Sequence, residues 1–494
     1  MKMFIRLTLL VSTVFLITIS CNKYLEVKPQ DNILESQVFS SINGFNLAIN
    51  GVYSELNDQT LYGANLTYGL LDVMAQLYNL TEREHIFAPY ITYEYSNSEY
   101  KSIIEAIWNN AYKFIANLNT IVYHTDLQQA MLGEQYYGIF KGEALACRAM
   151  LHFDLLRLFG SSYENEKDAL VLPYMTLNSR KVEPLLSNEE IIEKIIQDLL
   201  LAKDLLEPTD PVLKEGALNL DNPVSNLLNY RQYRLNYFAV KALLARAYLW
   251  KGDTQSAKKY ASEVIEEGQK KGNEIFPFVT QDAVTNRPNF PDRIFSTEVL
   301  FALYNTSRIN VQNMGFSNAL APIQILTFVG SLSDGRVPQL YPNENDFRRK
   351  LHWEQKVAGG GTEVLYFTKF LDVTDGNNVS LAYRYMYPLI RISEMYLIMA
   401  ETSDNLNDAE KYINILQTNR GLPDVSLNSG SELNDFILNE YIREFIGEGQ
   451  IFFYFKRLQK ENIPSPIRPG IDLFPMEKNY YAFPLPESET SQRN

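Results

Sequence analysis

Residues 397–416 read LIMAETSDNLNDAEKYINIL, and residues 245–264 read ARAYLWKGDTQSAKKYASEV. Five positions in each stretch follow one another at steps of 3, 9, 4 and 3 residues. They are Leu397, Ala400, Ala409, Ile413 and Leu416 in one stretch, and Ala245, Tyr248, Ala257, Ala261 and Val264 in the other. A helix-turn-helix repeat needs small residues where its two helices touch and larger ones beside them. The shared spacing therefore predicts a mainly α-helical chain built from packed helix pairs.

The same spacing is typical of tetratricopeptide repeats, and other segments extend the pattern. Apolar residues recur at intervals of three and four in the ranges 36–56, 103–123, 138–159, 191–206 and 235–250. Gly160, Pro208 and Gly252 follow three of these segments, and both residue types end helices. We predict a solenoid of tetratricopeptide-like helix pairs over residues 36–269, with a further helical part over residues 386–494.

Residues 270–385 have a different composition. They hold several prolines, the run Gly359-Gly360-Gly361 and many Asn, Thr and Phe residues, but few sustained helical stripes. We therefore predict an irregular, partly β insertion that packs on the helices. Together, residues 36–494 are expected to form one domain.

The first residues are typical of an export signal. Lys2 and Arg6 precede the apolar or hydroxylated run Leu7 to Ile19, which is shorter than a comfortable membrane span of about 20 residues. Ser20-Cys21 then resembles a bacterial lipobox, which implies a lipoprotein signal peptide at 1–20 and acylation of Cys21. Residues 21–35 would form a lipidated tether, and the alternative is ordinary secretion with an incidental thiol.

Composition excludes several classes of function. The 45 Lys and Arg residues against 59 Asp and Glu give a net charge of −14, so a nucleic-acid partner is not expected. Only two cysteines and four scattered histidines are present, and we predict no metal site and no catalytic residues. Glu394 and Glu401, which share a helix face, are interpreted as structural contacts.

Tyrosines suggest where a ligand binds. The segment 61–100 interleaves seven of them with Asn, Asp, Gln and Arg, the combination that stacks on sugar faces and hydrogen-bonds hydroxyl groups. Because residues 91–95 alternate, Tyr93 and Tyr95 are expected on one face of a strand. The candidate ligand-binding residues are Tyr78, Arg83, Tyr90, Tyr93, Tyr95, Asn97 and, in the insertion, Trp353.

A series of motifs, spread over nearly the whole chain, resembles the SusD/RagB family of outer-membrane nutrient-binding lipoproteins in its order along the sequence. They are Cys21-Asn22-Lys23-Tyr24-Leu25-Glu26, Trp108 to Asn119, Gly142-Glu143-Ala144, Leu158-Phe159-Gly160, Arg391 to Glu401, Asn419-Arg420-Gly421, Ile442-Arg443-Glu444-Phe445, Gly447-Glu448-Gly449, Lys456-Arg457-Leu458 and Phe483-Pro484-Leu485-Pro486. The last of these resembles the terminal strand of the family.

This resemblance implies a SusD-like protein held at the outer membrane by the lipid on Cys21 and facing the cell exterior. Such a protein captures glycans or oligosaccharides, passes them to a SusC-like TonB-dependent transporter and is not an enzyme. No cofactor is expected; the resemblance admits a structural calcium ion, for which the sequence holds no motif. Two other functions stay open: a helical scaffold lipoprotein that binds peptides or proteins but no sugar, and a glycan-cleaving enzyme.

Overall fold

The computed structural model of the chain describes residues 35–80, 84–161, 166–179, 181–218, 226–287, 289–357, 363–373, 381–468 and 470–493. The predicted signal peptide, the predicted lipidation site Cys21 and most of the predicted tether lie outside the described residues, as does Arg83. Within the described part of the chain, no helix is both long enough and apolar enough to cross a membrane.

The long helices occupy the segments in which apolar residues recur. They are α3 (Ile42–Glu55), α5 (Ser98–Leu127), α6 (Gln129–Phe159), α7 (Asn188–Leu206), α10 (Tyr237–Lys251), α11 (Thr254–Gly268), α16 (Ile392–Glu401), α17 (Leu406–Thr418), α18 (Gly430–Phe445) and α19 (Ile451–Arg457). The helices α5 and α6 begin several residues before the predicted ranges, and the continuous helix predicted over 36–56 is interrupted. Its regular part begins at Ile42, where the Ser41 hydroxyl accepts a hydrogen bond from the Gly44 N–H and caps the helix.

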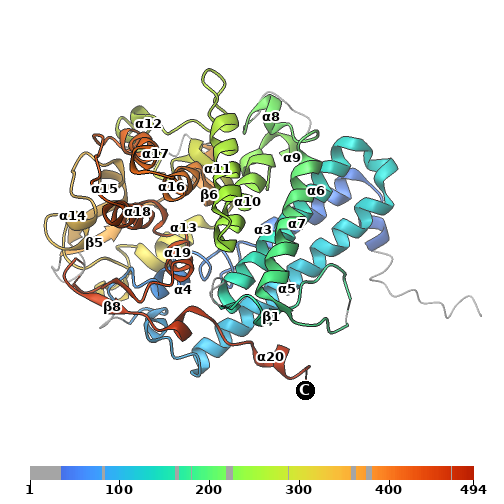
Figure 1. Cartoon of the computed structure of the whole chain (residues 1–494), viewed down its shortest axis with the longest axis horizontal. Coiled ribbons are helices and arrows are strands. Elements are labelled where there is room, and N and C mark those ends of the chain that lie inside the picture. Colours follow the sequence, from blue (N-terminus) through green and yellow to red (C-terminus); the bar gives the residue numbers. More distant parts are fainter. Residues whose placement is uncertain are drawn as a thin grey trace, which may run out of the picture.

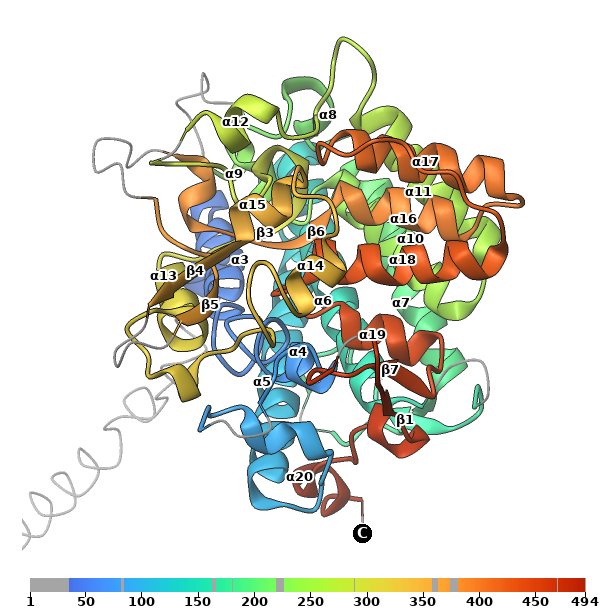
Figure 2. The same cartoon turned by 90° about the vertical axis from the view of Figure 1, so that its left-hand side faces the viewer.

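The helices stack in succession. In chain order, α5 packs on α6, α6 on α7, α7 on α10, α10 on α11, and α11 on α16. Figure 1 shows α5 to α7 on the right, α10 and α11 in the centre, and α16 to α18 on the left. In Figure 2, α17, α16 and α18 lie one above another. This arrangement confirms the mainly α-helical fold.

Both predicted repeat pairs form. Gly252, with φ of +83°, ends α10, and the Asp253 carboxylate accepts from the Ser256 N–H at the start of α11. Ala245 and Ala261 are fully buried in this pair, as Ala400 and Ala409 are in the pair α16–α17. Small side chains therefore stand where the helices touch, as the spacing predicts.

The segment 270–385 is irregular, as expected. Its short elements are α12 (Gln281–Thr285), α13 (Arg308–Val311), α14 (Arg336–Leu340), α15 (Phe347–His352), β3 (Val299–Tyr304), β4 (Trp353–Val357) and β5 (Glu363–Phe367). Strands β4 and β5 form a hairpin, whereas β3 pairs antiparallel with β6 (Met386–Arg391), which leads directly into α16. The β3–β6 sheet thus joins the insertion to the C-terminal helices.

The terminal strand predicted at Phe483–Pro486 is wrong. This segment belongs to no sheet, and the Phe483 N–H donates to the carbonyl of Leu158 at 3.0 Å. The remaining short elements are α4 (Leu70–Met74), α8 (Val212–Glu215), α9 (Asn226–Asn229), α20 (Glu487–Thr490), β1 (Leu170–Leu172), β2 (Leu186–Ser187), β7 (Asn462–Pro464) and β8 (Leu473–Pro475). The pairs β1–β2 and β7–β8 are antiparallel.

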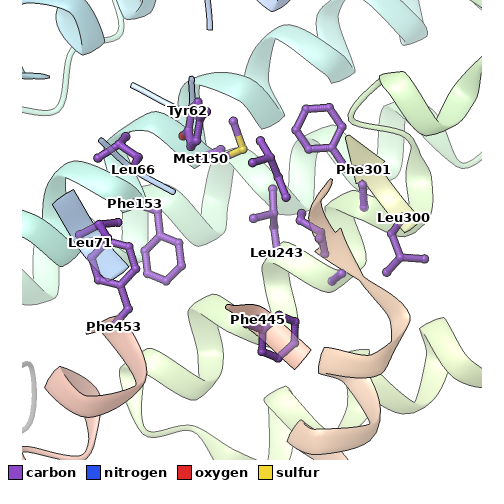
Figure 3. Packing of buried hydrophobic residues seen from close by; sticks show 14 of the residues in the cluster. Tyr62, Leu66, Leu71, Met150, Phe153, Leu243, Leu300, Phe301, Phe445 and Phe453 are labelled. Atoms are coloured by element: carbon purple, nitrogen blue, oxygen red, sulfur yellow. The ribbon is translucent and has the colours of Figure 1, made fainter. Parts of the chain in front are cut away.

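One large apolar core runs through the helices and the insertion. Figure 3 shows Phe153 of α6, Leu243 of α10, Phe301 of β3 and Phe445 of α18 within it. Burial of such side chains contributes roughly 2 kcal/mol each, so this core holds the two parts of the chain together.

A buried ionic network crosses the same boundary. The Glu444 carboxylate on α18 accepts hydrogen bonds from Arg348 of α15 at 2.7 Å, Arg391 of β6 at 2.7 Å and Arg420 at 2.6 and 3.0 Å. These arginines also pair with Asp346, Glu440, Glu298 and Glu448. Although burial alone raises the pKa of Glu444, Arg420, Arg391 and Arg348 hold that pKa well below its ordinary value.

Replacing Glu444 with Gln should therefore destabilise the fold strongly. The variant leaves three buried guanidinium groups without a shared anion, and breaking a buried pair in this way costs about 3–5 kcal/mol. Urea denaturation measures the change. Asp435→Asn, at an exposed position of the same helix, is the matched control and should stay within about 0.5 kcal/mol of the parent. Equal stability of the two variants would contradict the role given to Glu444.

Candidate functional site

The tyrosine-rich segment 61–100 packs inward. Six of its seven tyrosines are buried, namely Tyr62, Tyr68, Tyr78, Tyr90, Tyr93 and Tyr100, and Tyr95 is half-buried. Most of these rings therefore pack against the apolar core and do not face solvent. Direct ligand contacts by the candidate residues stay an untested prediction.

Tyr78 joins a buried polar contact. Its hydroxyl donates to the Asp72 carboxylate of α4 at 3.2 Å, and the Gly447 N–H donates to the same oxygen at 2.6 Å. The other carboxylate oxygen of Asp72 has no hydrogen-bond partner among the described residues. Burial raises the pKa of Asp72 to about 7, although these two donors oppose the shift. This contact ties the aromatic segment to the turn after α18.

Tyr93 does not lie on the predicted strand. Residues Ala88–Thr92 form a 3-10 helix, and Tyr93 follows it with a φ of +56°. Its side chain is 5% exposed, its ring stacks on Tyr480 at 4.4 Å between centroids, and its hydroxyl donates to the carbonyl of Met74. Residues 91–95 therefore cover the end of a 3-10 helix and the turn after it, not a strand, so the strand prediction is wrong.

The other candidates in this segment also have structural partners. Tyr95 donates to the carbonyl of Tyr480 at 2.5 Å, and the Tyr90 ring packs edge-on against Tyr100. Asn97 caps α5, because its side-chain oxygen accepts from the Glu99 N–H at 2.7 Å. Tyr95 and Asn97 are half-buried.

Trp353 lies inside the insertion. It is 3% exposed and packs against Phe328 and Phe367, with ring centroids 4.3 and 5.0 Å away. Its ring therefore stabilises the β4–β5 hairpin and does not face solvent.

Both acidic residues named in the sequence analysis, and two of the histidines, have structural partners. Glu394 pairs with Arg246 at 2.6 Å and Glu401 with Arg457 at 2.6 Å, which confirms their interpretation as packing contacts. His152 and His352 are buried and bonded to backbone groups. No cluster of three potential metal ligands occurs in the ranges that the structure describes.

A cleft of about 500 Å³ opens where the end of α3, the middle of α5 and the end of β3 meet. Tyr304, the last residue of β3, is 52% exposed and lines it. Its ring meets the rings of Tyr233 and Tyr385 edge-on, with centroids 5.3 and 5.4 Å away. These neighbours fix the orientation of an aromatic surface that faces solvent.

Polar groups surround this ring. The remaining lining residues are Ser54, Glu55, Asn57, Asp58, Asn110, Lys113, Phe114, Asn305, Thr306 and Ser307. The Asn57 amide donates to the Tyr304 carbonyl at 3.2 Å, which connects the α3 side of the cleft to β3. Lys113 pairs with Glu55 at 2.9 Å, so the wall offers donors and acceptors without an unpaired cation.

A second cleft, of about 450 Å³, lies beside α15 and the end of α17. Its rings are Phe278, which is half-buried, and Phe347, which is buried. It therefore presents less exposed aromatic surface than the cleft at Tyr304, which is the better candidate site.

Sequence reasoning missed the residues of the Tyr304 cleft. Two polar runs stand at the ends of rigid elements: Asn57-Asp58 comes just after a helix, and Tyr304-Asn305-Thr306-Ser307 begins at the last residue of a buried strand. Such positions often carry ligand contacts, because a rigid element holds them at the surface. The two runs are about 250 residues apart, however, and only the fold brings them together.

Comparisons with known proteins agree with this architecture. The model of the SusD family matches residues 228–492, and a SusD-like model described as "Starch-binding associating with outer membrane" matches residues 23–214. The SusD-like protein P2 of Formosa agariphila is 22% identical, over 96% of this chain and 95% of that protein.

Solved structures show the same fold. A SusD-like carbohydrate-binding protein from Bacteroides vulgatus superposes with a TM-score of 0.66 at 18% identity, covering 91% of this chain and 96% of its own. A SusD superfamily protein from Bacteroides thetaiotaomicron superposes with a TM-score of 0.65 at 23% identity, covering 91% of this chain and 98% of its own.

Paired helices, a loop-rich insertion and a polar aromatic cleft define a mainly α-helical repeat protein with one well-placed candidate binding site. The family match covers more than half of the sequence. The chain belongs to the SusD family, whose members are binding proteins known for starch and glycan binding at the cell surface. The description of the matching family model, "associating with outer membrane", supports association with the outer membrane.

Replacing Asp72 with Asn should make stability less dependent on pH. The pKa of Asp in an unfolded chain is about 3.9, whereas the pKa of Asp72 in the native state is about 7. Between these two pH values, the Asp72 carboxyl is protonated in the native state but not in the unfolded state. The stabilising contribution of Asp72 is thus complete below pH 4 and lost as the pH rises towards 7. The stability difference in favour of Asp72→Asn should grow over this range by up to about 4 kcal/mol. Denaturation curves at pH 4, 5, 6 and 7 measure it, and a constant difference would refute the assignment.

Replacing Tyr93 should affect stability in two graded steps. Tyr93→Phe removes the hydroxyl that bonds the Met74 carbonyl and should cost about 1–2 kcal/mol. Tyr93→Ala also leaves a cavity beside Tyr480 and should cost about 3–5 kcal/mol. Thermal and urea unfolding provide the values. If Tyr93→Ala unfolds like the parent protein, the ring is not part of the core.

Proposed function

We propose that this protein captures a glycan or oligosaccharide in the cleft at Tyr304. The observation that carries the proposal is an exposed, oriented tyrosine ring set among amide, hydroxyl and carboxylate groups. Membership of the SusD family supports it, because glycan binding is the known activity of that family.

The chemistry of the cleft suits a neutral sugar. The C–H face of a pyranose ring packs on an aromatic ring, while its hydroxyls need donors and acceptors at fixed positions. Tyr304 supplies the ring, and Asn57, Asp58 and Ser307 supply polar groups. Because Lys113 is paired with Glu55, the cleft holds no free cation that would favour a carboxylated sugar.

The further steps of the proposal concern location and delivery. A lipid on Cys21 would anchor the protein to the outer membrane, facing the cell exterior, and a SusC-like TonB-dependent transporter would take up the captured glycan. Support comes from the lipobox-like sequence at Cys21 and from the family description "associating with outer membrane".

Affinity electrophoresis against plant, host and microbial polysaccharides tests capture. The wild-type protein should be retarded by at least one of them, without release of new reducing ends. Tyr304→Ala should weaken that retention about tenfold or more, because truncating a central aromatic contact typically costs over 1 kcal/mol. Its melting temperature should stay close to that of the parent, since the ring is half exposed.

Tyr123→Ala is the matched control, because Tyr123 is 60% exposed but lies on α5 outside the cleft. It should bind like the parent. Equal retention of the Tyr304 and Tyr123 variants would remove the cleft from the site. Release of reducing ends would indicate an enzyme, and failure of every polysaccharide to retard the wild type would favour the scaffold that binds peptides or proteins.

A further inference from the structure

The second cleft lies where the insertion meets the last repeat pair. Its volume is about 450 Å³, and its walls come from the start of α12, from α15 and from the turn after α17. Figure 1 shows these three helices at the upper left. The cleft shares no lining residue with the cleft at Tyr304, so a substitution can alter either cleft alone.

Close packing holds this lining in place. The backbone N–H of Phe347 donates to the carbonyl of Arg420 at 3.1 Å. A Cβ atom at Gly421, whose φ is +76°, would lie 2.6 Å from the Phe347 ring, so this approach requires glycine. Arg420 also belongs to the ionic network around Glu444. A lining that is fixed in this way loses little entropy when a ligand binds.

Lys350 is the one charged residue that lines the cleft. Its ammonium group donates to the side-chain oxygen of Asn345 at 3.3 Å and forms no ion pair within the ranges that the structure describes. The adjacent Arg348 and Arg349 instead pair with acidic side chains. The exposed ammonium group of Lys350 is therefore available to an anionic group of a ligand.

The nearby acidic groups have other partners. On α12, Asp282 pairs with Arg287 at 3.2 Å. The Asp424 carboxylate accepts from the Thr418 hydroxyl at 3.4 Å, but Asp424 does not line the cleft and forms no ion pair with Lys350. The positive charge of the lining is thus not cancelled by a salt bridge.

The two clefts therefore differ in charge. Two carboxylates, those of Glu55 and Asp58, and one ammonium group, that of Lys113, line the cleft at Tyr304. The second cleft has one ammonium group and no carboxylate in its lining. Because like charges repel and opposite charges attract, the second cleft favours anionic ligands that the first disfavours.

Uncharged groups complete the second cleft. Phe278 is half-buried and offers part of an aromatic ring. Hydroxyl and amide groups come from Thr280, Gln281, Asn345, Thr418 and Asn419. A ring beside such groups suits the face and the hydroxyls of a sugar, and the volume lies in the range of about 300–1,000 Å³ that is typical of small-molecule sites.

We propose that the second cleft binds a carboxylated sugar, such as a uronic acid unit of a glycan, and that Lys350 pairs with its carboxylate. The choice of a sugar rests on the proposed glycan capture, whereas the choice of an anion rests on Lys350 alone. The site is additional to the cleft at Tyr304. An acidic peptide carries the same carboxylate but has no pyranose face to place on Phe278.

The test uses the purified protein and isothermal titration calorimetry with trimers of galacturonic, mannuronic and guluronic acid. Each acid is compared with its methyl ester, which keeps the sugar rings and removes the charge. At least one acid should bind about fivefold more tightly than its ester, the upper end of what an exposed ion pair contributes. Added salt should reduce this difference, because it screens exposed charges.

Three variants locate the binding. Lys350→Gln should lower the affinity for the acid to that for the ester, and Lys350→Arg, which keeps the charge, should preserve the difference. Lys411→Gln, at an exposed position of α17 outside the cleft, is the matched control and should bind like the parent. Equal affinities of the Lys350→Gln variant and the parent for the acid would overturn the proposal.

Other outcomes would also overturn it. They are failure of all three acids to bind, equal affinity for acid and ester, and equally tight, Lys350-dependent binding of a glutamic acid trimer, which would assign the cleft to acidic peptides. Tyr304→Ala separates this proposal from capture in the first cleft. That variant should keep the preference for the acid while it loses retention by the polysaccharide. Loss of both would place the acid in the cleft at Tyr304.

Discussion

The structure depends most on the carboxylate of Glu444, which three buried arginines share. Each arginine comes from a different part of the chain: Arg348 from the insertion, Arg391 from the end of β6, and Arg420 from the end of the second repeat pair. An uncompensated buried charge is so unfavourable that these parts adopt the arrangement in which all of them reach the same carboxylate. The network thereby fixes how the loop-rich insertion sits on the stack of helices.

The β3–β6 sheet connects this ionic network to the candidate binding cleft. Arg391 anchors one end of β6, and Tyr304 of β3 pairs with Met386 at the other end. Tyr385, directly before β6, packs edge-on against the Tyr304 ring. The buried contact of Arg391 and the exposed ring of Tyr304 therefore lie at opposite ends of one short sheet. Rigid support of this kind reduces the entropy that a binding site loses when it captures a ligand.

Periodicity predicted most of the helical fold, because the repeat alanines are buried where the spacing places them. The family-like motifs Arg391, Arg420, Glu444 and Glu448 proved to be one ionic network, which their order in the sequence alone does not reveal. The residues of the Tyr304 cleft were not among the candidates that the sequence suggested. Composition cannot distinguish a tyrosine on a surface from one such as Tyr93, whose burial depends on contacts with a segment almost 400 residues away. For the same reason, no sequence pattern indicates that Asn57 and Tyr304 meet.

The account proposed for this protein combines buried charges that hold a rigid helical frame with an exposed aromatic cleft that captures sugar. Hydrogen-deuterium exchange with and without a bound oligosaccharide tests this account most directly, because it maps the contact surface without mutation. Protection should be confined to residues 54–58, 110–114 and 304–307, which line the cleft. Protection centred on residues 78–97, or none near Tyr304, would contradict it.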